Sequence, residues 1–167
     1  DVGKIAVPAE VLNKPGKLTR EERFIIEGHA AAGSDLLANV EFPWDVLPMV
    51  RGHHERWDGR GYPDRLAGEN IPLAARVLCV ADVYDALTTD RPYRPGFSQE
   101  RALEIMSGDA GAAFDPDILQ RFIRIARQDG AVLVTEGDAT ASSPYSLGLL
   151  PHQPARTSVQ IQAVEWE

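Results

Sequence analysis

Residues 72–89 read PLAARVLCVADVYDALTT, and this stretch decides the fold. It predicts a helix over 72–89 with Pro72 near the first helical position, where a missing N–H costs nothing. Its centre, from Val77 to Ala81, is apolar on nearly every side, which is typical of a helix buried in the middle of a bundle. We therefore expect the rest of the chain to pack around this helix.

Two further helices are predicted before it. Thr19 and Glu22 have the spacing of a capping box, in which each residue satisfies the other's backbone amide. The helix that follows carries one face of residues at three- and four-residue steps: Ile26, His29, Gly33, Leu36 and Leu37. His29 is thus expected to point inward. The next helix is predicted to begin near Asp45 and to end before the loop at 58–63, which contains two glycines and a proline.

Two more helices are predicted after the central one. Ser98 is the expected N-cap of a short helix reaching Met106, and Asp115 followed by Pro116 marks the start of the last helix. That last helix has an apolar stripe formed by Ile118, Leu119, Phe122, Ile123 and Ala126. Only residues 131–134 have the pattern of a strand, and this predicted strand is short. The predicted fold class is all-α.

Composition narrows the possible functions. The chain has 167 residues with 17 basic and 25 acidic side chains, so its net charge is −8. This charge argues against binding to nucleic acid or to an anionic membrane, both of which would repel it. No apolar run approaches the roughly 18 residues of a membrane helix, and residues 1–10 lack the features of a signal peptide. The single cysteine, Cys79, forms no intramolecular disulfide, which favours a reducing, cytoplasmic location.

The end of the chain differs in composition from the rest. From Thr135 onward Ser, Thr, Gly, Pro and Ala dominate and no period is visible. We interpret 1–128 as the domain and 129–167 as an irregular C-terminal extension, a candidate for disorder that contributes little to the core. His152 lies in this extension and is expected to be solvated.

The candidate chemistry begins with two adjacent histidines, His53 and His54. Neighbours on a helix point about 100° apart, so both reach one site only if that site is large or holds more than one ion. Taken alone, the pair is better explained by a solvated surface. Asp82 strengthens the case, since no basic residue lies three or four positions away on its helix to pair with it. An unpaired buried carboxylate protonates, finds a distant arginine or helix N-terminus, or binds metal. With His29, His53 and His54 facing inward, we favour metal.

Asp and imidazole ligands suit Fe, Mn, Zn or Ni better than Mg or Ca. Two roles are equally favoured for Asp85: it orients a ligating histidine, or its carboxylate accepts from a backbone donor. Cys79 lies in an apolar helix and is expected to be inert. Lys4, Arg91 and Arg94 could be solvated surface residues, but beside a metal site they form a candidate anion cradle.

At this point the sequence resembles a known family, the HD-GYP domain of the HD phosphohydrolase superfamily. The resemblance covers about residues 1–126, and the segments that carry it are 1–8 (DVGKIAVP), 12–18 (LNKPGKL), 53–63 (HHERWDGRGYP), 81–88 (ADVYDALT) and 90–94 (DRPYR). It implies an all-α HD-domain helical bundle with two or three divalent metal ions, iron or manganese. It also implies hydrolysis of the bacterial second messenger cyclic di-GMP to pGpG and GMP.

The resemblance also implies residue roles. Asp1 matches the Asp of the family's His-Asp doublet, and His29, His53, His54 and Asp82 match further metal ligands. Other matching positions serve the substrate: Lys4 lies near the scissile phosphate, and Tyr62, Arg91 and Arg94 contact the nucleotide. The catalytic pair is Asp1 and Lys4.

The sequence departs from the family pattern at its start. The doublet's histidine, and an upstream Glu and His, have no counterpart in these 167 residues. We therefore expect an N-terminally truncated domain that hydrolyses cyclic di-GMP weakly or not at all. The alternatives are a non-catalytic module that docks to diguanylate cyclase (GGDEF) domains through the Gly-Tyr-Pro loop, or a hydrolase of another cyclic dinucleotide such as cyclic GMP-AMP.

Overall fold

The structure, a computed structural model, describes residues 1–90 and 95–132 without the side chains of 129–132. Within these ranges it contains helices and no strand. In chain order the elements are η1 (Val2–Ala6), α1 (Ala9–Leu12), α2 (Arg20–Glu27), α3 (His29–Leu37), α4 (Leu47–Gly52), η2 (Gly68–Asn70), α5 (Leu73–Thr88), α6 (Gln99–Gly108) and α7 (Pro116–Val132). The predicted all-α class is confirmed.

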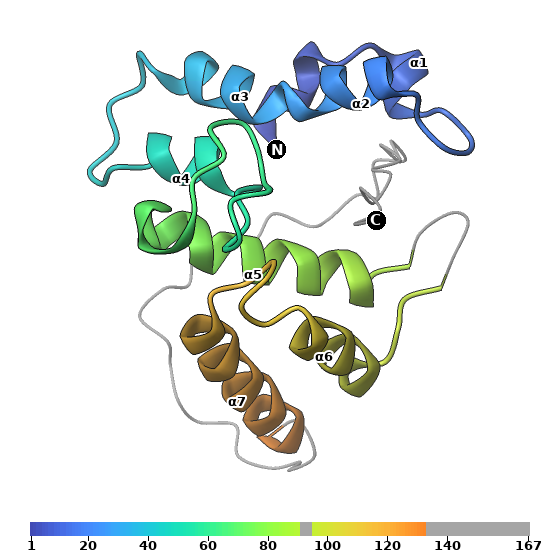
Figure 1. Cartoon of the computed structure of the whole chain (residues 1–167), viewed down its shortest axis with the longest axis vertical. Coiled ribbons are helices and arrows are strands. Elements are labelled where there is room, and N and C mark those ends of the chain that lie inside the picture. The colour runs from blue at the N-terminus through green and yellow to red at the C-terminus, as the bar shows by residue number, and fades with distance from the viewer. Residues whose placement is uncertain (91–94, 133–167) are drawn as a thin grey trace, which may run out of the picture.

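Helix α5 runs through the middle of the molecule (Figure 1). Helix α4 packs against one side of α5, and α6 and α7 pack against the other. Beyond α4 lies α3, which also carries η1, so the start of the chain lies in the same layer as α3. The central position predicted for the 72–89 helix is confirmed, with Pro72 as its N-cap.

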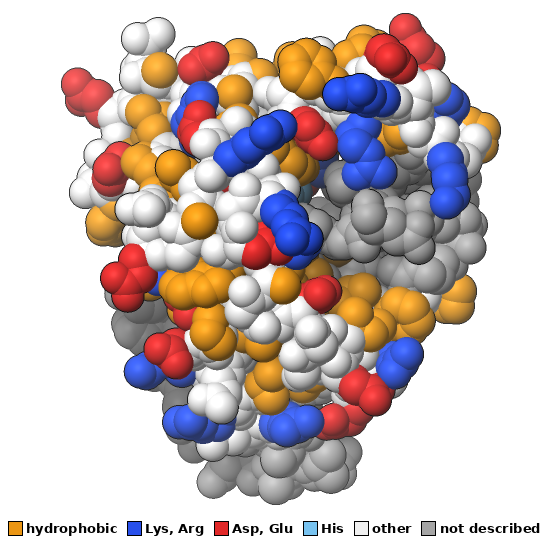
Figure 2. All heavy atoms as spheres, viewed as in Figure 1, with side chains coloured by type: hydrophobic (Ala, Val, Ile, Leu, Met, Phe, Trp, Pro, Cys, Tyr) orange, Lys and Arg blue, Asp and Glu red, His pale blue; other side chains and the backbone are white. Residues whose placement is uncertain are grey.

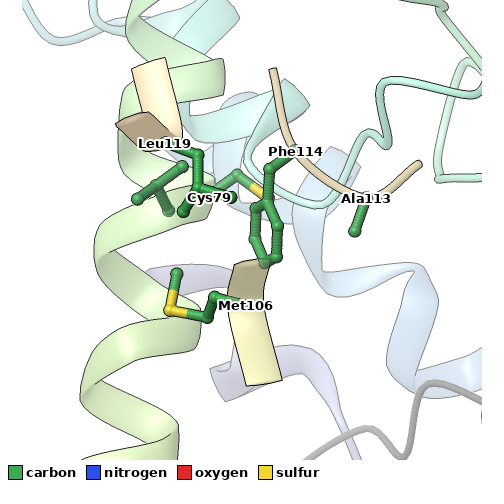
Figure 3. Packing of buried hydrophobic residues seen from close by; sticks show 6 residues of the cluster. Cys79, Met106, Ala113, Phe114 and Leu119 are labelled. Carbon is green, nitrogen blue, oxygen red and sulfur yellow. The ribbon is translucent and has the colours of Figure 1, made fainter. Parts of the chain in front are cut away.

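The main core lies where α5, α6 and α7 meet (Figure 3). Cys79, Met106, Phe114 and Leu119 converge there, and each is at most 4 % exposed. Full burial of an apolar side chain of this size contributes about 2 kcal/mol. A smaller cluster of Val7, Val11 and Ile26 holds the first residues of the chain on α2. One cluster therefore holds the end of the described chain against α5, and the other holds its start against α2.

Local capping chemistry fixes where three helices begin. Thr19 Oγ1 accepts the amide of Glu22 at 3.2 Å, and a Glu22 carboxylate oxygen accepts the amide of Thr19 at 2.7 Å. Ser98 Oγ accepts the amide of Arg101 at 3.4 Å. Asp115 Oδ1 accepts the amides of residues 117 and 118 at 2.9 and 3.3 Å. All three predicted caps are confirmed.

Helix α5 is less buried than its composition predicts. Leu73 is 62 % and Val77 is 49 % exposed, and Ala81 is exposed as well. These residues are four positions apart and form one strip along the helix. The described helices cover the other sides of α5 and leave this strip open, so the expectation of a helix buried all round is wrong.

The predicted helix after Thr19 is two helices, because α2 ends at Glu27 and α3 begins at His29. Glycine at the junction, Gly28, has a low helix propensity. The buried residues of α3 are His29, Ala30 and Gly33, and Leu37, one turn further along, is half-buried. Leu36 falls outside this buried set and is 53 % exposed, so its predicted burial is wrong.

The last helix runs further than expected. Helix α7 continues to Val132, so the predicted strand is wrong at residues 131 and 132, where apolar residues extend the helix. The rest of that strand, and the predicted irregular extension from 133 onward, lie outside the described residues.

We expect Asp115→Ala to lower the free energy of unfolding by about 3 kcal/mol. The variant removes the cap of α7 and leaves Arg76, whose guanidinium donates to Asp115 Oδ2 at 2.7 Å, as a largely buried charge without its partner. Urea unfolding of the chain measures the change. Glu104→Ala removes an exposed carboxylate from a surface pair and should cost less than about 1 kcal/mol. Equal effects in the two variants would contradict the role of Asp115.

Candidate metal centre

Three buried histidines come together from two helices. His29 is the first residue of α3, and His53 and His54 directly follow the end of α4 at Gly52. Their exposed fractions are 2 %, 3 % and 9 %. The ring centroids of His53 and His54 are 4.1 Å apart, and that of His29 lies 5.4 and 5.0 Å from them. The inward direction predicted for these rings is confirmed.

The adjacent pair does not diverge as the sequence suggested. The helix predicted to include His53 and His54 ends at Gly52, where His53 is the C-cap and His54 lies in a turn. His53 keeps backbone angles of the helical region, φ −66° and ψ −13°, and the two ring centroids nevertheless lie 4.1 Å apart. Both rings can face one site of ordinary size.

Two hydrogen bonds decide which ring nitrogens are free. His29 Nδ1 lies 2.6 Å from the carbonyl oxygen of Ile26, and His53 Nδ1 lies 2.7 Å from that of Val50. A carbonyl oxygen only accepts, so each Nδ1 carries the hydrogen and each Nε2 keeps its lone pair. The Nε2 atoms of His29, His53 and His54 are buried and have no hydrogen-bond partner among the described residues.

Burial also keeps these rings neutral. Desolvation lowers the pKa of His29 to about 4 and that of His54 to about 2, and it lowers the pKa of His53 as well. The neighbouring positive charge of Lys4 acts in the same direction on all three. At neutral pH the imidazoles are therefore in the form that binds metal.

Asp1 completes the cluster. Its Oδ1 lies 3.4 Å from His29 Nε2 and 3.7 Å from His53 Nε2, while its Oδ2 accepts from Lys4 Nζ at 2.7 Å. One ligand atom from each of Asp1, His29, His53 and His54 lies within 4.8 Å of the others. The carboxylate oxygen of Asp1 and the Nε2 atoms of His29 and His53 are all acceptors, so a cation between them would stabilise their convergence. The arrangement fits a divalent metal ion.

Close backbone packing brings Asp1 to this position. The backbone of Gly3 lies against α3, where a Cβ on Gly3 would be 2.0 Å from the carbonyl oxygen of His29 and 2.4 Å from the amide nitrogen of Gly33. No side chain fits at Gly3 without moving η1 away from α3. The sequence analysis missed Gly3, whose only sequence signal is that a glycine lies two residues from Asp1.

Asp82 on α5 is close enough to the cluster for its charge to act on His53, but it is not one of the four closest ligands. It is half-buried, and no hydrogen bond or ion pair joins it to another of the described residues. Its negative charge raises the pKa of His53, against the larger effect of burial. Within the part of the chain that the structure describes, the Asp82 carboxylate is thus unpaired as predicted, and its role as a metal ligand stays a prediction.

The other candidate residues are found in different surroundings. The ring of Tyr62 stacks on His54, with centroids 4.8 Å apart, and its hydroxyl is buried. Asp85 is exposed, and its Oδ1 accepts the hydroxyl of Thr89 at 3.2 Å, which is neither a histidine ring nor a backbone donor. Cys79 is buried, and burial raises the pKa of its thiol to about 12, as expected of an inert cysteine. Arg91 and Arg94 lie outside the described residues.

The histidine cluster is enclosed by the fold. Figure 2 shows acidic and basic side chains interspersed over one face of the molecule and hardly any histidine surface. One enclosing residue was missed by the sequence analysis. Glu55, which follows the histidine pair, is 2 % exposed and accepts two backbone amides. Burial raises the pKa of the Glu55 carboxyl.

Comparison with known proteins identifies this arrangement. A family model described as HD domain matches residues 1–118. The chain belongs to the HD domain family. HD domains bind divalent metals, and in this HD domain Asp1, His29, His53 and His54 form the cluster that could hold one.

Two curated relatives share much of this HD domain. A cyclic di-GMP phosphodiesterase of Vibrio cholerae is 40 % identical over 83 % of this chain and 30 % of its own length. The cyclic di-GMP phosphodiesterase response regulator RpfG of Xanthomonas campestris is 44 % identical over 74 % of this chain and 33 % of its own length. The chain thus spans about a third of the length of these relatives.

A solved structure confirms the fold of this HD domain. The crystal structure of a cyclic GMP-AMP specific phosphodiesterase from V. cholerae aligns with a TM-score of 0.55 at 22 % identity. The alignment covers 78 % of this chain and 34 % of that one. No helix of the described residues is long and apolar enough to cross a membrane.

We expect Gly3→Ala to weaken both the fold and metal binding. The added methyl group cannot be placed beside the carbonyl oxygen of His29, so η1 must shift and carry Asp1 away from the histidines. Thermal unfolding and a Mn²⁺ titration measure the two effects. Gly108→Ala is the matched control, since a Cβ at Gly108 meets nothing within 4 Å. Identical behaviour of the two variants would contradict the spacing role of Gly3.

We expect the metal-free chain to lose stability as the pH falls below about 6.5. The pKa of His29 is about 4 in the folded chain, so between these values the unfolded chain takes up a proton that the folded chain does not. Acid therefore favours unfolding. Urea midpoints measured at several pH values between about 7.5 and 5.5 should decrease, and His29→Gln should flatten the decrease. A midpoint that stays constant or rises on acidification would rule this out.

Proposed function

We propose that the chain is the catalytic part of a metal-dependent phosphodiesterase that hydrolyses cyclic di-GMP to pGpG and GMP in bacterial second-messenger signalling. Membership of the HD domain family and the names of the two curated relatives support this assignment. The whole protein's activity and its substrate remain part of the proposal, as does its predicted cytoplasmic location.

One observation carries the proposal, namely the convergence of acceptor atoms at the histidine cluster. Asp1 Oδ1 lies 3.4 and 3.7 Å from two buried Nε2 atoms that have no other partner among the described residues. A proton could join such atoms only if a histidine were basic enough, and burial makes His29 far less basic than usual. A metal ion would bind all of these acceptor atoms at once and so stabilise the arrangement.

Asp1, His29, His53 and His54 would hold the first ion. Asp82 would extend the site from α5 toward a second, and we propose two or three ions in all, iron or manganese, since Asp and His ligands suit these metals. When bound, such ions activate water for attack on a phosphorus atom at neutral pH.

The surrounding residues would position the substrate. Lys4, whose side chain is 15 % exposed and pairs with Asp1, holds a positive charge beside the cluster, where a phosphoryl oxygen develops negative charge. Arg91 and Arg94, which follow the helix that carries Asp82, would bind the phosphates of the dinucleotide. The substrate contact proposed for Tyr62 would involve an edge of its ring, because one face of that ring stacks on His54 and the hydroxyl is buried.

The alternative of a docking module has less support from the loop itself. Gly61 is buried and Tyr62 is half-buried against His54, so a partner could reach the flanking Arg60 and Arg65 more easily than the Gly-Tyr-Pro residues. Docking to a diguanylate cyclase (GGDEF) domain stays a prediction.

We expect the chain loaded with Mn²⁺ or Fe²⁺ to convert cyclic di-GMP slowly to pGpG. His53→Ala should reduce the rate by at least about 100-fold, since losing even an indirect partner of a metal costs 10–100-fold. Product formation followed by chromatography, with and without a chelator, measures this.

Glu104→Gln serves as the control for this assay, because Glu104 is an exposed residue of α6 whose pairing with Arg101 is a surface contact. Hydrolysis that persists in the chelator or in His53→Ala would contradict the proposal. Parallel assays with cyclic GMP-AMP identify the preferred nucleotide, and faster turnover of that substrate would replace cyclic di-GMP in the assignment.

A further inference from the structure

The three histidines are not held in the same way. His29 and His53 are each fixed by an Nδ1 hydrogen bond to a backbone carbonyl of the preceding helical turn. The ring of His54 makes no hydrogen bond to the described residues. Its orientation depends on packing, and its most nearly parallel neighbour is the ring of Tyr62, 4.8 Å away with an interplanar angle of 28°.

Tyr62 reaches His54 because residues 55–66, the 55–66 loop, fold back on the end of α4. The amide of Tyr62 donates to the carbonyl of His54 at 3.2 Å. Gly61 allows this return, since a Cβ there would lie 2.3 Å from the amide nitrogen of Arg56 and 2.6 Å from the carbonyl oxygen of His54. The loop thus places the Tyr62 ring over the histidine that lacks a hydrogen bond of its own.

Glu55 closes this loop from inside. One carboxylate oxygen of Glu55 accepts the amide of Asp64 at 2.7 Å, and the other accepts the amide of Leu66 at 3.0 Å. Arg65 between them has φ 56°, a conformation that is uncommon for a residue other than glycine and carries strain. This turn aims the amides on either side of Arg65 at one buried carboxylate. The hydrogen bonds to Glu55 offset the strain.

We propose that Glu55 is a positioning residue of the metal centre, which holds the 55–66 loop so that Tyr62 fixes the ring of His54 for metal binding. The inference rests on the proposed function, because it assigns His54 to a metal. Glu55 itself acts through the loop, and both of its carboxylate oxygens are engaged by backbone amides.

Glu55→Gln tests this with little change of volume. A glutamine side chain has only one oxygen, and its NH₂ group cannot accept an amide, so one of the two loop amides loses its partner. Glu22→Gln is the matched control, because it also removes one negative charge and one acceptor, but its contacts are to Lys14 and Thr19 at the start of α2. Tyr62→Ala removes the contact with His54 and leaves the charge unchanged.

The measurements are Mn²⁺ affinity by calorimetry and thermal unfolding of the metal-free chain. We expect about 10–100-fold weaker Mn²⁺ binding in Glu55→Gln and in Tyr62→Ala, as for other residues that orient metal ligands, and unchanged binding in Glu22→Gln. The double variant should bind no more weakly than the weaker single variant, since both act through one contact. A purely structural role would lower the unfolding temperature and leave the Mn²⁺ affinity of the folded chain unchanged.

The outcomes separate the two proposals. A wild-type chain that binds no Mn²⁺ overturns the metal centre and, with it, the role of Glu55. A wild-type chain that binds Mn²⁺, together with a Glu55→Gln variant that binds it equally well, overturns the role of Glu55 alone. Losses of Mn²⁺ affinity that add up in the double variant would also overturn the role of Glu55 alone. If Glu55→Gln does not fold, Tyr62→Ala decides, and unchanged affinity in that variant overturns the inference.

Discussion

The chemistry of this HD domain depends on two hydrogen bonds from ring nitrogens to backbone carbonyls. By donating Nδ1–H to Ile26 and Val50, His29 and His53 turn their Nε2 lone pairs toward the carboxylate of Asp1. Burial lowers the pKa of both rings, so both are neutral at neutral pH. A neutral ring with a fixed tautomer and an unsatisfied acceptor atom is ready to bind a metal ion through that atom. The rest of the fold holds these acceptors at short range.

The fold achieves this by bringing three separate segments to one side of α5. Gly3 lets η1 lie directly on α3, which places Asp1 beside His29. His53 and His54 follow directly on the end of α4 at Gly52, and their ring centroids lie 4.1 Å apart, so both rings reach the same site. Helix α5 supplies the common support, with the core of Cys79, Met106 and Leu119 on its opposite side. Asp82 belongs to this same helix, and its negative charge raises the pKa of His53.

Much of this could be predicted from sequence because the signals are local. The caps at Thr19, Ser98 and Asp115 depend on side chains within three residues of the amides they bind, and the inward phase of His29 follows from helical spacing. The approach of Gly3 to Gly33 and the two amides that reach Glu55 join residues that only the folded chain brings together. The exposure of Leu73 and Val77 also escaped prediction, because composition does not tell which sides of a helix its neighbours cover.

The central claim is that His29 and His53 are neutral with Nδ1 protonated. A long-range proton–nitrogen correlation spectrum of the metal-free chain measures this directly, since it distinguishes the two neutral tautomers from the imidazolium ion. At about pH 7 the account predicts Nδ1–H and an unprotonated Nε2 for both residues, because burial lowers both pKa values below the ordinary value of about 6.5. For His29, whose pKa is about 4, the same state persists at about pH 6. An imidazolium ion at either residue, or a hydrogen on Nε2, would contradict it.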